Sequence, residues 1–384
     1  MEITSIKDLI DLLKDIDEPQ LGYSRFFRGH SDKEWELEPS IYRIPKKVEG
    51  KPQERAFIEN EDNIIRDAIV NSPNDFSDRD SIFSTLVKLQ HYGYPTRLLD
   101  LTTNALVALY FATQSLDDKD DKDDKDDKDG KLYIFDIPNS EIKYFDSDTV
   151  SILSALSLRR ENFRIDGYKS MSKMNSQLGK LYSVCELFKS NNLILSDRDS
   201  TKIKEFYFHF KDDLMINQEM VRFDDNKINE LEKFVNDLIE KYPINNLELT
   251  SLSESTKKNA IELFNKQPNI ARLLHDIRKD KPSFLPVIES KDLERVICVK
   301  SKLDNNRIIR QQGCFLLFGM NNFKKNKAIL DDKWLRKDNQ GNEIIIPKDK
   351  KQNILNELKV FGISEKTLFP ELESQAKEIL AKYK

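Results

Sequence analysis

LVKLQHYGYPTRLLDLTTNALVALYFA (residues 86–112) is the stretch that decides the fold of this chain. An apolar run over 105–112 ends it, and polar side chains, among them His91, Arg97 and Asp100, crowd the part before that run. Burying such groups without partners costs free energy, so a segment used only for packing would not need them. The stretch therefore predicts a buried helix beside a functional site.

The run 105–112 predicts a central helix because it is apolar on every face. Asp100, Thr102 or Thr103 could cap its first turn, since short polar side chains accept hydrogen bonds from free backbone N–H groups. A buried strand is the alternative, but alanines recurring at helical spacing favour the helix.

Three segments before this run show apolar side chains at helical spacing. These segments are 4–16, 52–70 and 80–91. Gly93 can serve as the C-cap of the third, and Pro95 prevents its continuation. We therefore expect three amphipathic helices in the first 91 residues.

Strand patterns complete the picture of the fold. Residues 23–43 begin as a short aromatic strand that breaks at Gly29, where glycine permits positive φ or a close approach of the backbone to a ligand. Further strands are expected at 131–137, 284–288, 295–300, 314–318 and 343–346. Further helices are expected at 149–160, 171–189, 227–242, 254–277, 348–360 and 365–383. This mixture predicts an α+β fold, a mixed or antiparallel sheet flanked by helices.

The composition limits the classes of protein to which the chain can belong. A chain of 384 residues can form one large domain or two. No apolar run reaches the roughly 18 residues of a membrane span, and no basic region precedes the apolar residues of the N-terminus. Three scattered cysteines suggest a reducing compartment, and no metal-ligand spacing occurs. We expect a cytoplasmic protein with no membrane contact and no bound metal.

The acidic balance of the chain comes from one insert. Residues 117–129 contain nine Asp and four Lys, so this segment has a net charge of −5, the same as the whole chain. The rest is balanced, with 58 basic and 58 acidic residues, so no global charge argues for nucleic acid, although a local patch is not excluded. A repeat of this composition cannot bury apolar surface, so we expect 117–129 to be a disordered loop.

Three blocks of the sequence resemble the FRG domain family, named for a Phe-Arg-Gly signature. They are FFRGH (26–30), QHYGYPTRLLDLTTNALVALYFA (90–112) and RIIRQQGCFLLFG (307–319), and LKVFGISEKTLFPELE (358–373) resembles the end of that domain. The resemblance implies a single FRG domain over 1–384, with a helical insertion or subdomain at 149–283. It also implies a prokaryotic role in antiviral (antiphage) defence or as a toxin.

A second, weaker resemblance is to ADP-ribosyltransferases, and it implies a related fold and NAD as substrate. In that resemblance Arg28 binds a phosphate or ribose of NAD, and Thr102 or Thr103 supports the strand or the ribose. Tyr110 stacks on nicotinamide, and Gln312 lies where these enzymes usually carry the catalytic acid. A glutamine cannot act as a general base or supply negative charge, so this departure weakens the catalytic case.

These blocks together predict one polar pocket. The expected catalytic residues are His91, Asp100 and Gln312. The expected ligand-binding residues are Arg28, Gly29, His30, Gln90, Arg97, Thr102, Thr103 and Tyr110. Several of them also have a structural alternative: Arg28 or Arg97 paired with Asp100, His91 at a helix end, the threonines as caps, Tyr110 in the core and Gln312 as a strut.

Three functions follow from this pocket as hypotheses. The leading one is an effector that binds an NAD-like nucleotide and transfers or cleaves ADP-ribose. The alternative is a non-catalytic sensor that binds a nucleotide, nucleic acid or a phage protein. The third is a structural interaction protein, in which pocket substitutions alter stability and no activity.

Overall fold

The computed structural model describes residues 1–44, 56–77, 79–114, 128–210, 224–242, 258 and 261–371. The chain forms two compact units. Unit 1 comprises Met1–Ser157, Arg295–Gly319 and Lys327–Lys384, and unit 2 comprises Leu158–Glu294 and Met320–Asn326. A single FRG domain over 1–384 with an insertion at 149–283 stays a prediction.

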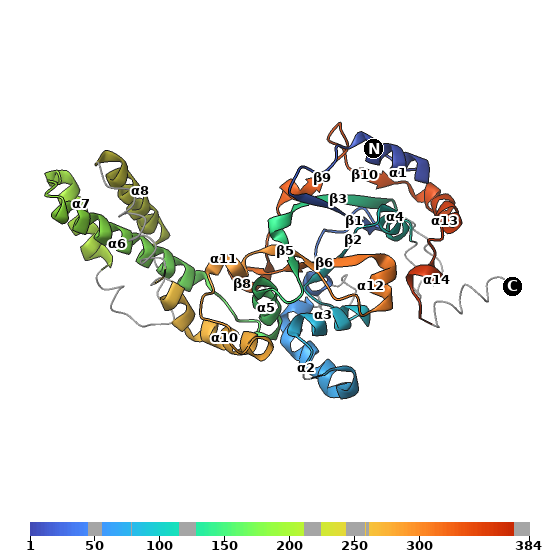
Figure 1. Cartoon of the computed structure of the whole chain (residues 1–384), viewed down its shortest axis with the longest axis horizontal. Helices are drawn as coiled ribbons and strands as arrows, with labels where there is room; N and C mark the ends of the chain where they lie inside the picture. The colour runs from blue at the N-terminus through green and yellow to red at the C-terminus, as the bar shows by residue number, and fades with distance from the viewer. Residues whose placement is uncertain are drawn as a thin grey trace, which may run out of the picture. The chain divides into compact units, whose positions relative to one another are not determined.

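Unit 1 is built on an eight-stranded sheet with helices against it (Figure 1). The order is β10-β3-β1-β2-β6-β5-β4, with β9 also paired to β3. The strands are β1 (Tyr23–His30), β2 (Leu98–Thr102), β3 (Gly130–Pro138), β4 (Ile142–Tyr144), β5 (Val296–Lys300), β6 (Gly313–Phe318), β9 (Leu335–Arg336) and β10 (Ile344–Ile346). Among the described strands of this sheet, β4 and β5 pair in parallel and the other pairs are antiparallel, so the predicted α+β class with a mixed sheet is confirmed.

Helices and apolar side chains cover the sheet of unit 1. The helices are α1 (Ile6–Asp15), α2 (Glu61–Asn71), α3 (Ile82–His91), α4 (Ala105–Ala112), α5 (Asp148–Ala155), α12 (Asn306–Gln311), α13 (Lys351–Val360) and α14 (Glu365–Leu368). One core joins α1, α4 and α13 to β1, β3 and β10. Because side chains alternate along a strand, Phe27 of β1 lies in this core and Phe26 lies in a second one.

Helix α4 is the central buried helix that the sequence predicts. Its apolar residues pack on all sides because neighbouring elements surround it. The cap differs from the prediction: Asn104 Oδ1 accepts a hydrogen bond of 3.0 Å from the N–H of Leu106. Thr102 instead accepts, at 3.0 Å, from the N–H of Asn104, so it stabilises the capping residue.

Gly29 lies inside β1, which continues to His30, so the predicted break was wrong. A Cβ at this position would lie 2.0 Å from the carbonyl oxygen of Ala108 and 2.5 Å from the amide nitrogen of Ala112. The close approach that requires glycine is therefore to the backbone of α4 and not to a ligand. The three residues of the Phe-Arg-Gly signature thus have different roles. Phe27 packs in the core, Arg28 lines the cavity described below, and Gly29 allows α4 to contact the sheet.

Other predicted elements also need correction. The strand at 284–288 was wrong, because Pro286 cannot donate a backbone hydrogen bond and Leu285 and Val287 are exposed. The helix at 52–70 begins only with a 3-10 turn at Phe57–Asn60, and residues 45–55 lie outside the described ones. The same is true of 115–127 in the charged repeat and of 372–384 in the last predicted helix.

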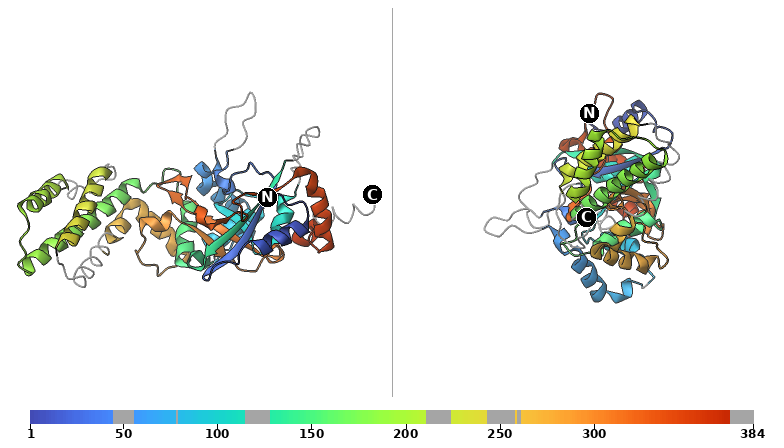
Figure 2. Two further views of the ribbon diagram at one scale, coloured as in Figure 1. Left: turned by 90° about the horizontal axis from the view of Figure 1, so that it is seen from above. Right: turned by 90° about the vertical axis from the view of Figure 1, so that its left-hand side faces the viewer.

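Unit 2 is mainly helical. Its elements are α6 (Asp166–Ser190), α7 (Asp197–Phe210), α8 (Asp225–Lys241), α10 (Pro268–Asp280), α11 (Ser290–Leu293), β7 (Met320–Asn321) and β8 (Phe323–Lys327). Helices α6 and α8 run side by side (Figure 2) around a core that includes Val184 and Leu231. Helix α7 was not predicted. The predicted helix at 254–277 is interrupted at Gln267, because proline follows.

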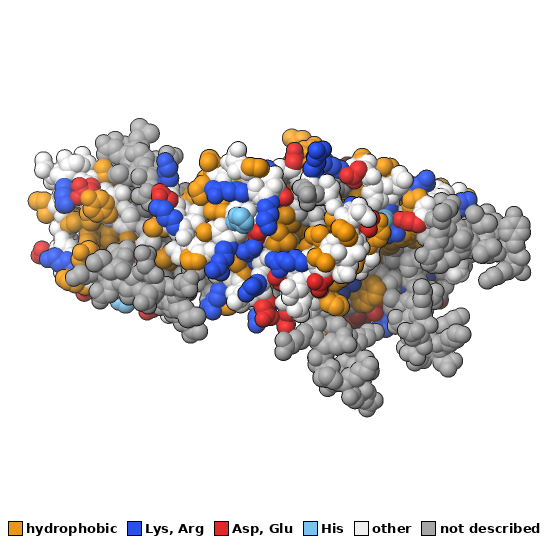
Figure 3. Space-filling view, turned by 90° about the horizontal axis from the view of Figure 1, so that it is seen from below, with side chains coloured by type: hydrophobic (Ala, Val, Ile, Leu, Met, Phe, Trp, Pro, Cys, Tyr) orange, Lys and Arg blue, Asp and Glu red, His pale blue; other side chains and the backbone are white. Residues whose placement is uncertain are grey.

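The surface carries charge of both signs (Figure 3), with Lys and Arg side chains gathered on part of this face. In unit 2, α10 exposes Arg272, Arg278 and Lys279. Some basic character is therefore local, although the chain outside its acidic repeat is neutral. Across the helices that the structure describes, none combines the length and apolar character required to span a membrane.

Candidate functional site

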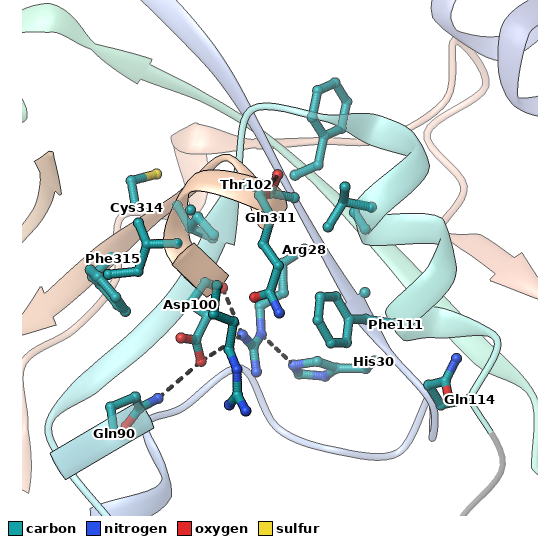
Figure 4. A pocket seen from close by; sticks show the side chains of 18 of the residues that line it. Arg28, His30, Gln90, Asp100, Thr102, Phe111, Gln114, Gln311, Cys314 and Phe315 are labelled. Carbon is teal, nitrogen blue, oxygen red and sulfur yellow. Dashed lines mark hydrogen bonds and ion pairs between the residues drawn. The ribbon is translucent and has the colours of Figure 1, made fainter. Parts of the chain in front are cut away.

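A cavity of about 350 Å³ lies in unit 1 where β1 and β2 diverge (Figure 4). These two strands are paired at Phe27 and Thr102, and beyond this pair Arg28 occupies the space between them. Helices α3, α4 and α12 supply further walls, and Phe369 contributes from the C-terminal segment. The cavity is therefore bounded by all three sequence blocks that predict a site.

Arg28 is the central cation of this cavity. Its Nε donates to His30 Nε2 at 2.8 Å, and its Nη1 donates to the backbone oxygen of Asp100 at 2.6 Å. The nearest carboxylate oxygen that pairs with it, Asp100 Oδ2, is 3.9 Å away. Burial lowers the pKa of Arg28 to about 10, so the guanidinium remains charged at neutral pH. The cavity thus contains a shielded positive charge without a carboxylate in direct contact.

Arg97, in the same unit, differs from Arg28 because a carboxylate neutralises its charge directly. It is completely buried, and its Nε donates to Glu61 Oε1 at 2.8 Å while Nη2 binds the other carboxylate oxygen. Its Nη1 donates to the carbonyl of Phe318 at 3.0 Å. Arg97 therefore does not line the cavity, and its predicted local pair with Asp100 was wrong, because Arg97 pairs with Glu61 whereas Asp100 lines the cavity.

His30 is held neutral beside Arg28. Burial, together with the cations Arg28 and Arg43, lowers the pKa of His30 to about 2. Because Nε2 accepts the hydrogen bond from Arg28, the proton of the neutral ring lies on Nδ1. His30 therefore positions the guanidinium and is not available as a general base.

The depressed pKa of His30 predicts acid sensitivity. The pKa of His30 is about 6.5 in the unfolded chain and about 2 in the folded chain. Between these two values the unfolded chain binds the proton and the folded chain does not, so the protein becomes less stable as the pH is lowered. From pH 6.5 to 4.5 this histidine should cost unit 1 roughly 2–3 kcal/mol. His30→Gln keeps an acceptor for Arg28 and does not titrate, so urea unfolding should show a smaller loss in this variant. Equal losses would contradict the assignment.

Asp100 is oriented by a short chain of hydrogen bonds. Gln90 Nε2 donates to Asp100 Oδ2 at 2.9 Å, and Thr96 Oγ1 donates to Gln90 Oε1 at 2.6 Å. The side chain of Asp100 remains 57% exposed, so the carboxylate is accessible from the cavity. Asp100 and Gln90 therefore lie together in the site, as the sequence suggests.

His91 is the last residue of α3 and lines another part of the cavity. Burial, and next the charge of Arg307, lowers the pKa of His91. Its Nε2 lies 3.6 Å from Glu371 Oε1, so it contacts the C-terminal segment as well as the cavity.

Thr102, Thr103 and Gln312 connect β2 to the end of α12. Thr102 Oγ1 donates to the carbonyl of Gln311 at 2.6 Å, and the N–H of Thr103 donates to the carbonyl of Gln312 at 3.2 Å. Gln312 has a left-handed backbone with φ of 48° as the C-cap of α12, so it does not occupy a catalytic position on a strand. Thr102 lines the cavity, but Thr103 and Gln312 do not, and Gln311 points there instead.

Tyr110 is also absent from the cavity lining, because it is buried in the core against α4's neighbours. Phe111, the next residue, faces the cavity together with Val107 and Gln114. Their spacing is helical, so a helical wheel over 105–114 would have pointed to this face. Other lining residues that sequence reasoning missed are Trp35, Arg43, Arg307, Gln311, Cys314, Phe315 and Phe369.

The cavity is cationic and partly aromatic. Among the described residues that line it, three are arginines, namely Arg28, Arg43 and Arg307, and one is acidic, namely Asp100. Such a site favours an anion joined to a flat or apolar group. Within the described ranges, no group of three or more His, Cys, Asp and Glu side chains could hold a metal ion.

Comparison with known protein families gives a match over part of the chain. Residues 24–121 match the family model of the FRG domain. This interval contains β1, α3, β2 and α4, which supply most walls of the cavity, whereas α12 and Phe369 lie outside it. No curated protein and no solved structure matches the chain.

Proposed function

Because residues 24–121 match the FRG domain, we propose that this domain binds a phosphorylated nucleotide of the NAD class in the cavity at Arg28. The observation that carries the proposal is the shielded Arg28 guanidinium. Its N–H groups are hydrogen-bond donors, but the carboxylate oxygen with which it pairs lies 3.9 Å away, too far for a direct hydrogen bond. A buried cation gains most from an anion that can contact its fork directly. Phosphate supplies such oxygens in suitable geometry.

The size and lining of the cavity support a nucleotide over a bare anion. A volume of about 350 Å³ lies at the lower end of small-ligand pockets, which span roughly 300–1,000 Å³. Trp35 and Phe111 offer aromatic faces, and Gln114 and Gln311 offer amide groups that can bind a base or ribose. A ligand with one anionic and one aromatic part uses all of these groups.

Arg28→Gln tests the binding step. Loss of the charged fork should weaken nucleotide binding about 30-fold or more, as expected for loss of hydrogen bonds to a charged group. The chain has two tryptophans, and Trp334→Phe leaves Trp35 in the cavity as the reporter. Titrations of this variant with NAD, ADP-ribose, ATP and GTP, followed by fluorescence and calorimetry, measure the change.

Arg310→Gln is the matched control for this titration. Arg310 is exposed on α12 and does not line the cavity, so its removal changes the net charge equally and should leave binding within about twofold. Arg28→Lys keeps the charge without the fork and should fall between the wild type and Arg28→Gln. Nucleotide binding that survives unchanged in Arg28→Gln would overturn the proposal.

We propose as its catalytic form that the bound nucleotide is NAD and that ADP-ribose is cleaved or transferred. The glycosidic bond between ribose C1′ and nicotinamide would break, nicotinamide would leave with the bonding electrons, and water or a target nucleophile would add to C1′. Asp100, held by Gln90, offers negative charge to the developing oxocarbenium ion. In a cell, such activity would account for a toxin or antiphage effector.

Incubation with NAD tests this catalytic form. Release of nicotinamide that is lost in Arg28→Gln would support it. A nucleotide that stabilises the protein and is recovered unchanged would favour the alternative, a non-catalytic sensor. The sensor is favoured by the scarcity of catalytic groups in the cavity. Among the described lining residues Asp100 is the one carboxylate, and it already accepts a hydrogen bond from Gln90 and lies near Arg28.

A further inference from the structure

Arg307 and His91 converge on a carboxylate of the chain itself. Glu371 Oε1 lies 3.0 Å from Arg307 Nη2, accepts a hydrogen bond of 3.2 Å from Arg307 Nε, and lies 3.6 Å from His91 Nε2. The other oxygen, Oε2, is enclosed and has no hydrogen-bond partner among the described residues. Oε1 thus contacts both Arg307 and His91, while Oε2 is enclosed.

The segment that carries Glu371 also packs on the cavity. The ring of Phe369 lies 4.8 Å from the Arg307 guanidinium carbon and 6.1 Å from the ring of Phe111, measured to ring centroids. Arg307, His91, Phe111 and Phe369 all line the cavity. The carboxylate is therefore bound at the cavity wall and not at a remote surface.

Arg307 has a second attachment that does not depend on Glu371. Its Nη1 donates to the backbone oxygen of His91 at 3.3 Å, which ties the guanidinium to the end of α3. If the carboxylate leaves, this bond still holds the arginine beside His91. Phosphate oxygens can accept the same hydrogen bonds as a carboxylate.

We propose that Arg307 and His91 form a second anion subsite of the cavity, occupied by Glu371 until a ligand with a second anionic group displaces it. This inference rests on the proposed nucleotide site at Arg28. It names the ligand class more closely: a nucleotide with at least two phosphate groups, such as a pyrophosphate-linked dinucleotide, in preference to a mononucleotide. Glu371 then lowers the affinity for such ligands because it competes for the Arg307 guanidinium and the His91 ring.

Glu371→Gln tests the subsite, with NAD and AMP as probes in calorimetry. The substitution keeps the size of the side chain and removes the competing charge. NAD affinity should rise about tenfold, while AMP, which needs only the Arg28 subsite, should change by less than about twofold. Glu365→Gln removes the same charge from α14 without touching Arg307 and should alter neither affinity.

The outcomes separate this inference from the proposal on which it rests. Unchanged or weaker NAD binding in Glu371→Gln, or an equal gain for AMP, would overturn the second subsite. If the wild type binds NAD through Arg28 and Glu371→Gln has no effect, only the subsite fails. If neither protein binds either probe, the nucleotide proposal fails and the subsite fails with it. Arg307→Gln, verified as folded by tryptophan fluorescence, should weaken NAD about tenfold and leave AMP unchanged.

Discussion

Glu61→Gln is expected to lower the free energy of unfolding of unit 1 by about 3–5 kcal/mol. The glutamine has nearly the size of glutamate but leaves the fully buried Arg97 without a countercharge. The guanidinium cannot escape its charge by deprotonation once Glu61 is gone, because an arginine side chain stays protonated in proteins. Breaking one side of a buried pair therefore costs far more than the pair contributes in net stability.

Urea unfolding followed by tryptophan fluorescence measures this loss. Both tryptophans of the chain, Trp35 and Trp334, lie in unit 1, so the signal reports that unit alone. Glu343→Gln is the control, because Glu343 pairs with Lys131 at 2.6 Å from an exposed position, and its loss should cost no more than about 1 kcal/mol. Similar losses of unfolding free energy in both variants would show that the buried pair of Glu61 and Arg97 contributes no more than a surface pair.

Gly29→Ala should destabilise unit 1 by about 3 kcal/mol or more, at the upper end of overpacking substitutions. The new methyl group would lie 2.0 Å from the carbonyl oxygen of Ala108, which is backbone and cannot rotate away. Helix α4 would have to move off β1, and it carries Val107 and Phe111 of the cavity wall. The variant should therefore lose nucleotide affinity as well as stability.

Gly313→Ala is the matched glycine for this comparison. A Cβ at Gly313 would meet its nearest neighbour, Ile308 Cγ2, at 3.6 Å, which is ordinary contact. Its unfolding free energy should stay within about 1 kcal/mol of the wild type. A Gly29→Ala protein as stable as Gly313→Ala would show that α4 does not pack backbone to backbone on β1.

Much of the fold of unit 1 could be predicted because its signals are local. The caps and apolar spacing of α1 and α3 and the uninterrupted apolar run of α4 lie within about ten residues each. Strand β2 was missed because its pattern has only five residues and is interrupted by the exposed Asp100. A short strand is stabilised mainly by the strands with which it pairs. In β2, Leu98 lies opposite Leu317 of β6, a residue far away in the sequence.

The lining of the candidate cavity could be predicted in part for the same reason. Polar residues in Phe-Arg-Gly and in 90–102 marked two of its walls, and Arg28, His30 and Gln90 do meet there. The role of Arg97 depended on Glu61, which no local pattern connects to it. The choice between Gln311 and Gln312 depended on one residue at the end of α12, where a left-handed backbone turns Gln312 away. The contribution of Phe369 required knowledge of tertiary contacts.

Arg28 should receive an anionic group of a nucleotide, and a crystal structure of the chain with its tightest-binding nucleotide would show this contact. We expect a phosphate oxygen within about 2.7–3.1 Å of the Arg28 guanidinium, in the cavity between β1, β2 and α4. A nucleotide bound elsewhere, with Arg28 still contacting only His30 and Asp100, would contradict it.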